Sequence, residues 1–259
     1  MTGSGGVVAV VLAETVAGAL ALLWLTPLWG EVKRGYFKLS GAIILVLAGS
    51  AWFSASSGVT PGDHTGRAVL ALAMATAATT LAWTLLTFFK QWALSRAIGF
   101  SSVVASTATL VAMAGTARQS EALALFQLLA GAAFLGAVLD GLLLGHWYLT
   151  DRGLSRGPIN RYTAILLASM IPEAAAVVSG GFGGVGSSSS FNPLLTVGAL
   201  APWIALGSVV TTAVIAVMVK MTLKGDRASA VQSATGFFYL AVITALVAEL
   251  AMKTRFLPR

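Results

Sequence analysis

The chain has 259 residues, of which 57% are hydrophobic and 10% charged, and its mean hydropathy is +0.87. A soluble domain normally carries about a quarter charged residues, so this composition excludes a water-soluble globular protein. The net charge of +7 calls for no nucleic-acid partner, because basic residues of membrane proteins gather in cytoplasmic loops. The lack of cysteine excludes disulfides, thiolate metal sites and iron–sulfur clusters.

Apolar runs of about 20 residues, the length that crosses a bilayer as a helix, recur along the chain. We therefore predict an all-α polytopic membrane bundle that forms one domain, residues 1–259. Its spans are placed at residues 6–29, 39–58, 67–89, 97–117, 122–149, 161–180, 193–220 and 228–251. The connections are short, so consecutive helices should run antiparallel, with no room for an extramembrane catalytic domain.

The basic residues are distributed unequally over the two sides of these spans. Eleven of the sixteen follow the odd-numbered spans: Lys33, Arg34, Lys38, Lys90, Arg96, Arg152, Arg156, Arg161, Lys220, Lys224 and Arg227. The other five are Arg67, Arg118, Lys253, Arg255 and Arg259. The positive-inside rule then places both termini on the extracytoplasmic side, and we expect a bacterial plasma membrane.

The first four spans contain one acid, Glu14, and two stripes of small hydroxylated residues. The stripes are Thr76, Thr80, Thr84 and Thr87 on the third span and Ser101, Ser102, Ser106, Thr107 and Thr109 on the fourth. Hydroxyl groups commonly hold membrane helices together, so we predict helix packing here, with a polar pathway as the alternative.

The fifth span combines Asp140, a Gly141/Gly145 pair suited to close helix packing, and the sequence His146-Trp147-Tyr148. A histidine donor beside two aromatic rings near the membrane surface predicts a quinone contact; the alternative is a polar interface anchor. Aromatic residues that include Tyr36 and Tyr162 also cluster at this boundary and are predicted to anchor helices there.

Haem is a weaker prediction, because the other histidine, His64, lies on the opposite side of the membrane. No metal site is expected, since two distant histidines and scattered acids do not supply convergent ligands.

In the sixth span Pro172 directly precedes Glu173. Proline inside a span frees a backbone carbonyl and bends the helix, which predicts a local opening around this carboxyl group. The following residues 181–186 match the pattern GxGxxG, but that dinucleotide fingerprint requires a strand before it and a helix after it. We predict a loop that ends where Pro193 begins the seventh helix.

Glu249 in the eighth span completes a set of four acids inside predicted spans, with Glu14, Asp140 and Glu173. Each costs a few kcal/mol in hydrocarbon and should face a partner or water. No lysine or arginine is predicted well inside a span to neutralise them. We predict a proton relay or ion site, the alternative being protonated carboxyl groups that hydrogen-bond to neighbouring helices.

These features predict an integral membrane subunit of an energy-converting redox complex, respiratory or photosynthetic. It would contact a quinone, relay protons, depend on partner subunits and not be catalytic alone. One alternative is a proton- or cation-coupled secondary transporter of a small solute, for which internal repeats are expected and only the repeated tripeptide Leu-Ser-Arg at 94–96 and 154–156 is found. The other is a structural scaffold.

Overall fold

The computed structural model describes residues 2–59, 63–182, 193–225 and 229–256, and only the backbone of 193–199. Over these ranges the chain forms eight long α-helices, one short 3-10 helix and no strand. The elements are α1 (Gly3–Leu25), η1 (Thr26–Trp29), α2 (Arg34–Gly58), α3 (His64–Phe88), α4 (Trp92–Ala114), α5 (Glu121–Thr150), α6 (Gly157–Ser179), α7 (Pro193–Leu223) and α8 (Ala230–Phe256).

All eight helices are long and apolar enough to cross a membrane, which confirms the predicted all-α polytopic bundle. Large apolar side chains such as Val46, Phe53 and Ile171 are about 70% exposed or more on its outer surface, as suits contact with lipid. The chain is an integral multi-pass membrane protein. Most predicted ends agree within a few residues; the exceptions include α2, which begins five residues earlier, and α8, which continues five residues beyond its predicted end to Phe256.

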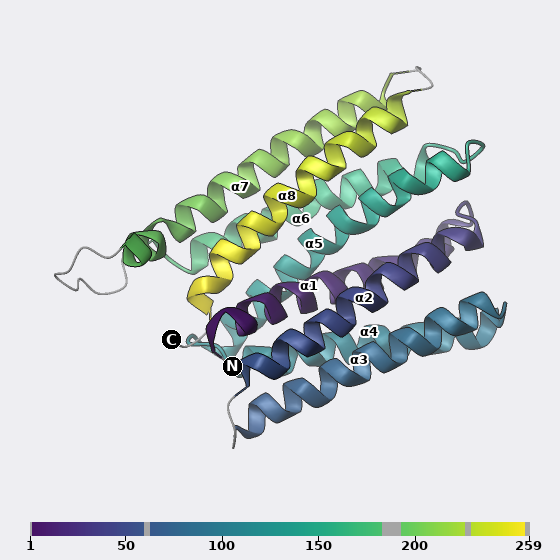
Figure 1. Cartoon of the computed structure of the whole chain (residues 1–259). Coiled ribbons are helices and arrows are strands. Elements are labelled where there is room, and N and C mark those ends of the chain that lie inside the picture. The colour runs from purple at the N-terminus through teal and green to yellow at the C-terminus, as the bar shows by residue number, and fades with distance from the viewer. Residues whose placement is uncertain (1, 60–62, 183–192, 226–228, 257–259) are drawn as a thin grey trace.

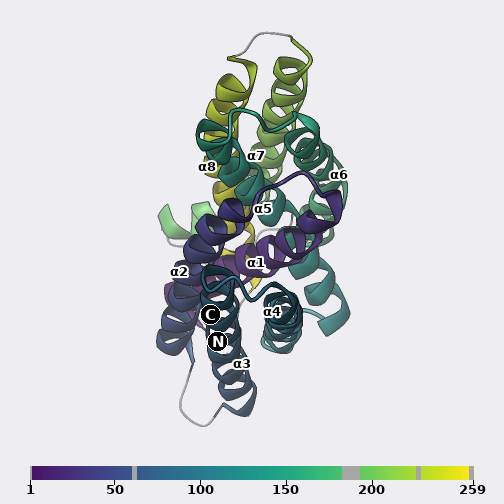
Figure 2. The ribbon, with the colours of Figure 1, turned by 90° about the vertical axis from the view of Figure 1, so that its right-hand side faces the viewer.

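The bundle consists of two four-helix halves with the same helix order (Figures 1 and 2). In the first half each helix packs against the next and α4 returns to α1; α5 to α8 repeat this arrangement in the second half. The halves meet mainly through α1 and α5, the two most deeply buried spans. The first copy of Leu-Ser-Arg lies in the first turn of α4 and the second directly precedes α6, which are not equivalent places in the halves.

Glycines bring α1 and α5 into backbone contact at this junction. A Cβ atom added to Gly18 would lie 1.7 Å from the carbonyl oxygen of Ala132, and one added to Gly136 would lie 2.3 Å from the carbonyl carbon of Gly18. Small residues allow such close approach of membrane helices. Gly141 and Gly145 pack in the same way against Phe238 and Thr235 of α8, as predicted.

The odd-numbered connections lie at one end of the bundle, and both termini lie at the other end (Figure 1). The basic residues in and beside these connections therefore gather at one end of the bundle, which is called the basic end below. Its assignment to the cytoplasm stays a prediction from the charge rule. The end that carries the termini is called the outer end below.

Candidate functional site

Three of the four predicted acids come together with a lysine in the core. Glu14 of α1 and Glu249 and Lys253 of α8 are fully buried, and Lys253 Nζ lies 2.7 Å from Glu14 Oε1 and 3.1 Å from Glu249 Oε2. Glu173 of α6 is equally buried and interacts electrostatically with all three. We call these four residues the outer cluster, because at 1.5 Å per residue they lie about 9 to 17 Å from the outer end of the helices, except Lys253, which is closer.

The buried lysine corrects the sequence prediction that no basic residue neutralises these acids. Lys253 was placed beyond the eighth span, but α8 continues to Phe256 and carries Lys253 into the core. The spacing of Glu249 and Lys253 could have predicted this ion pair, because side chains four residues apart lie side by side on a helix.

A glycine of the central helix makes space for the outer cluster. A Cβ atom added to Gly131 of α5 would lie 2.8 Å from an oxygen of Glu14 and 2.8 Å from an oxygen of Glu249. Within the described part of the chain, the carboxylate oxygens of Glu14, Glu173 and Glu249 make no hydrogen bond of normal geometry. Lys253 therefore forms ion pairs with Glu14 and Glu249 and interacts electrostatically with Glu173.

A pair of amide side chains, Gln127 and Gln119, lies between the outer cluster and the outer end of the bundle. Gln127 is buried on α5 one turn outward from Gly131, and residues four apart lie on the same helix face. Its amide nitrogen donates to Ala176 O and to Ser179 Oγ, both at 3.2 Å, and its oxygen accepts from the partly exposed Gln119. Sequence reasoning missed this pair, because neutral glutamines carry no charge signal.

Pro172 does not interrupt α6, which is one continuous helix from Gly157 to Ser179. The helix runs through the proline without a break, and the predicted bend and local opening around Glu173 stay predictions. Proline still removes one N–H group from the helix, one residue before the buried Glu173.

Asp140, the fourth predicted acid, lies apart from the others, nine residues along α5 from Gly131 and so about 14 Å away along the axis. It is fully buried, and the Tyr162 hydroxyl lies 3.4 Å from its Oδ2. Tyr162 also hydrogen-bonds to Thr26 Oγ1 at 2.6 Å, and the Tyr36 hydroxyl donates to the backbone oxygen of Asp140 at 3.3 Å. Because hydroxyl groups both donate and accept, protons in this group can be arranged in either direction.

The two tyrosines correct a second prediction. Tyr36 and Tyr162 were assigned to the aromatic belt, but both are fully buried around Asp140. They come from the second helix of each half, so the inner group of Asp140, Tyr36, Tyr162 and Thr26 lies where the halves meet.

The side chains of His146, Trp147 and Tyr148 diverge, because consecutive helix residues point about 100° apart. His146 contacts Tyr239 of α8, Trp147 packs over Gly35 of α2, and the Tyr148 hydroxyl donates to the backbone of the α5–α6 connection. They do not surround one ring-shaped ligand. His146 with the half-exposed Tyr239 is the part of this predicted site that reaches the outer surface of the bundle.

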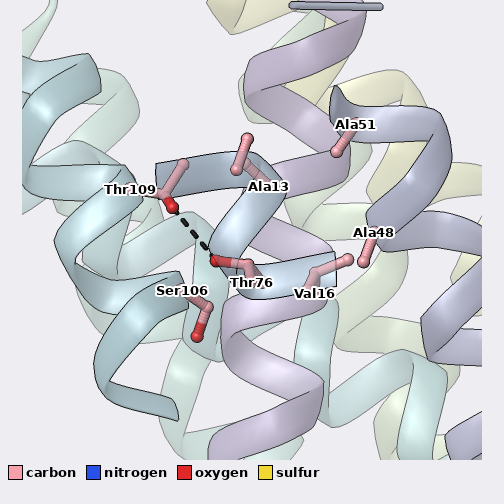
Figure 3. Close-up of a pocket in the computed structure, with 8 residues that line it drawn as sticks. Ala13, Val16, Ala48, Ala51, Thr76, Ser106 and Thr109 are labelled. Atoms are coloured by element: carbon pink, nitrogen blue, oxygen red, sulfur yellow. Dashed lines mark hydrogen bonds between the residues drawn. The ribbon is translucent and has the colours of Figure 1, made fainter. Parts of the chain in front are cut away.

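The hydroxyl stripe of α3 supports helix packing. Thr76, Thr80, Thr84 and Thr87 are buried, and each hydroxyl donates to a carbonyl one turn earlier on its own helix. Thr76 also reaches Thr109 of α4 at 3.2 Å, beside a pocket of about 10 Å³, which is room for about one water (Figure 3). This core of the first half contains hydroxyl groups in place of charges.

The exposed basic end contains a separate ion pair. Glu31, between η1 and α2, accepts hydrogen bonds from Ser155 and from the Arg161 guanidinium. These two bonds, chiefly that from Ser155, lower the pKa of Glu31 below its usual value.

Comparison of the chain with protein-family models, curated proteins and solved structures finds no match in any of the three. Among the described residues there is no group of three histidine and acidic side chains that could hold a metal ion. The residues in the GxGxxG pattern beyond Phe182 lie outside the described part of the chain.

Proposed function

We propose that the chain is an integral membrane subunit of an energy-converting redox complex, respiratory or photosynthetic, in a bacterial plasma membrane. Its task is to pass protons through the bundle by way of the outer cluster. The observation that carries this proposal is the composition of the cluster, three buried carboxyl groups with one buried ammonium group.

The charges of the outer cluster do not balance when all four groups are ionised. Lys253 can neutralise one carboxylate, which leaves two negative charges in a region where each uncompensated charge costs several kcal/mol. Protons shared among Glu14, Glu173 and Glu249 remove this cost. A site that holds protons in hydrocarbon and has polar side chains, Gln127 and Gln119, between it and the outer end is suited to proton transfer.

The inner group extends this path toward the basic end. Asp140 on the same helix is joined to Tyr162 and Thr26, so a proton that reaches Asp140 can continue along hydroxyl groups. The gap of about 14 Å between Gly131 and Asp140 requires bridging water, a motion of the acids, or both.

A proton path needs an energy source, and we infer that partner subunits supply it through their redox centres.

The contact of α1 with α5 favours this function over a transporter, because the backbones touch at Gly18 and Gly136. The Glu14–Lys253 ion pair also joins the two halves. A rocking motion between the halves would separate this pair in hydrocarbon.

The quinone contact fits the residues only in part. Trp147 and Tyr148 do not face His146, so we retain only His146, with Tyr239, as the place where a quinone carbonyl would bond. No step of the proton path depends on this contact.

The first test is purification of the full chain from its native membrane in mild detergent. We expect partner proteins whose optical spectrum reports redox centres, and bound quinone that falls when His146 is replaced by alanine. A colourless, solitary protein would contradict the assignment to a redox complex.

The second test measures proton translocation by the isolated complex in vesicles. Glu173→Gln and Glu249→Gln should each lower it by about a hundredfold, the usual contribution of a positioned proton-transfer group. Glu121→Gln is the matched control, because Glu121 is an exposed acid at the outer end. Unchanged translocation after all four buried acids are replaced by amides would leave only the scaffold function.

A proton- or cation-coupled secondary transporter is the second candidate. Two halves of like topology that enclose a charged site at their junction are typical of transporters, and Pro172 weakens α6 beside Glu173. Solute-dependent proton uptake by the purified chain alone, abolished in Glu173→Gln, would favour this candidate.

A further inference from the structure

A cavity of about 250 Å³ lies within the first half, at the basic end of the bundle. The ends of α1 and α3 and the beginnings of α2 and α4 surround it. Three indole rings and a phenyl ring form much of its wall: Trp24, Trp83, Trp92 and Phe37. This cavity is far from the outer cluster and plays no part in the proposed proton path.

The opening of the cavity carries two cations. The Arg34 guanidinium carbon lies 4.1 Å from the centre of the Trp92 ring, and that of Arg96 lies 5.4 Å from the centre of the Trp24 ring. Both arginines are exposed, and none of the described residues that line the cavity is acidic. The cavity therefore has a positive potential that nothing in its wall cancels.

The backbone adds to this potential. Helices α2 and α4 both begin at the cavity, and neither first turn is capped by a side chain. Free N–H groups at a helix N-terminus attract anions.

One hydrogen-bond donor without a partner belongs to a residue that lines the cavity. The indole N–H of Trp92 is buried and has no hydrogen-bond partner among the described residues. The hydroxyl groups of Thr87 and Ser95 lie 3.0 Å apart, but their protons are used, since Thr87 donates to Trp83 O and Ser95 donates to Thr87.

We propose that this cavity binds the phosphate group of an anionic lipid. Arg34 and Arg96 donate charge-assisted hydrogen bonds to the phosphate oxygens, and Trp92 Nε1 donates another. Basic pockets between helices at the cytoplasmic surface are known to take anionic headgroups, and the charge rule assigns this end to the cytoplasm.

The wall favours a lipid over free phosphate as the source of that group. Aromatic side chains make favourable apolar contacts with the part of a lipid next to its phosphate, such as the glycerol backbone and the first methylene groups. Phe100, half exposed on α4, packs against Trp24 at a ring distance of 5.3 Å, so the aromatic wall continues to the outer surface. The volume is below the roughly 300–1,000 Å³ of pockets that enclose whole drug-sized ligands, which fits a headgroup whose chains stay outside.

The test compares binding of phosphatidylglycerol, phosphatidylcholine and inorganic phosphate to the purified full chain in neutral detergent. Thermal stability and tryptophan fluorescence report binding. We expect phosphatidylglycerol to stabilise the chain at concentrations where the other two do not, and Arg34→Gln and Arg96→Gln to weaken its binding about tenfold each. Arg152→Gln is the matched control, because Arg152 is exposed at the same end and does not line the cavity.

Each outcome decides the proposal. An equal response to inorganic phosphate identifies the free ion and overturns the lipid. An equal response to phosphatidylcholine, or equal weakening by Arg152→Gln, overturns the site. If an arginine variant does not fold, Trp92→Phe preserves the ring and removes the donor, and unchanged phosphatidylglycerol affinity in that variant overturns the assigned role of Trp92.

Discussion

The outer cluster and the inner group stabilise buried acids in opposite ways. In the outer cluster, an ammonium ion pairs with Glu14 and Glu249 and interacts electrostatically with Glu173. In the inner group, Asp140 has two tyrosine hydroxyl groups around it and no cation among its described contacts. Helix α5 contributes to both regions, since Gly131 lies beside the outer cluster and Asp140 belongs to the inner group.

This difference teaches which kind of change each region tolerates. A cluster held by charge loses its balance when one ion is removed, because the remaining ions stay buried. A group held by neutral hydroxyls loses hydrogen bonds but gains no unpaired charge, at a cost of about 1–3 kcal/mol. The outer cluster should therefore be the more sensitive region.

Replacement of the buried lysine should have the largest effect. Lys253→Met removes the cation that neutralises Glu14 and Glu249, and breaking a buried pair typically costs about 3–5 kcal/mol. The loss is measured as a fall in thermal stability in detergent. Lys220→Met, an exposed lysine on α7, is the control and should change little.

A double variant sharpens this prediction. If charge balance is the cause, Lys253→Met combined with Glu14→Gln should recover part of the lost stability. A double variant no more stable than Lys253→Met would show that packing, not charge, explains the loss.

Filling the space beside the outer cluster should have the next largest effect. Gly131→Ala puts a methyl group 2.8 Å from oxygens of Glu14 and Glu249, and overpacking typically costs about 1–3 kcal/mol. Gly236→Ala on α8 meets no atom within 4 Å and should be neutral or slightly stabilising. Equal melting temperatures for these two variants would contradict the packing described here.

At the inner group, Tyr162→Phe should cost about 1–3 kcal/mol, because it removes the hydroxyl that bonds to Thr26 and to the buried carboxyl group of Asp140. The melting temperatures of Tyr162→Phe and Lys253→Met, measured in the same detergent, compare the two regions directly. A loss as large as that of Lys253→Met would end the distinction between the two regions.

The exposed pair at the basic end gives the smallest effect. Hydrogen bonds from Ser155 and Arg161 lower the pKa of Glu31 in the folded chain. The stability that Glu31 contributes is therefore present above its unfolded pKa and is lost as the pH falls through the lowered folded pKa. Glu31→Gln should remove this acid-range dependence of the melting temperature, while Glu121→Gln should leave it in place.

Some features of this protein follow from its sequence because they depend on local transfer energies. The eight spans and the placement of the basic residues at one end could be predicted from hydropathy and charge alone. The four buried acids could be named as candidates, since any carboxyl group in a span is costly. Gly141 and Gly145 could be assigned to close packing, because only small residues allow it.

Tertiary structure decided which of these residues meet. Depth along a helix is readable from sequence, but rotation about the axis and the choice of neighbour depend on packing of the whole bundle. Thus Glu14, Glu173 and Glu249 converge while Asp140 does not, Lys253 enters the core, and Tyr36 and Tyr162 face the interior of the bundle. The divergence of His146, Trp147 and Tyr148 follows from the helix itself, but packing decided their partners, Tyr239 for His146 and Gly35 for Trp147.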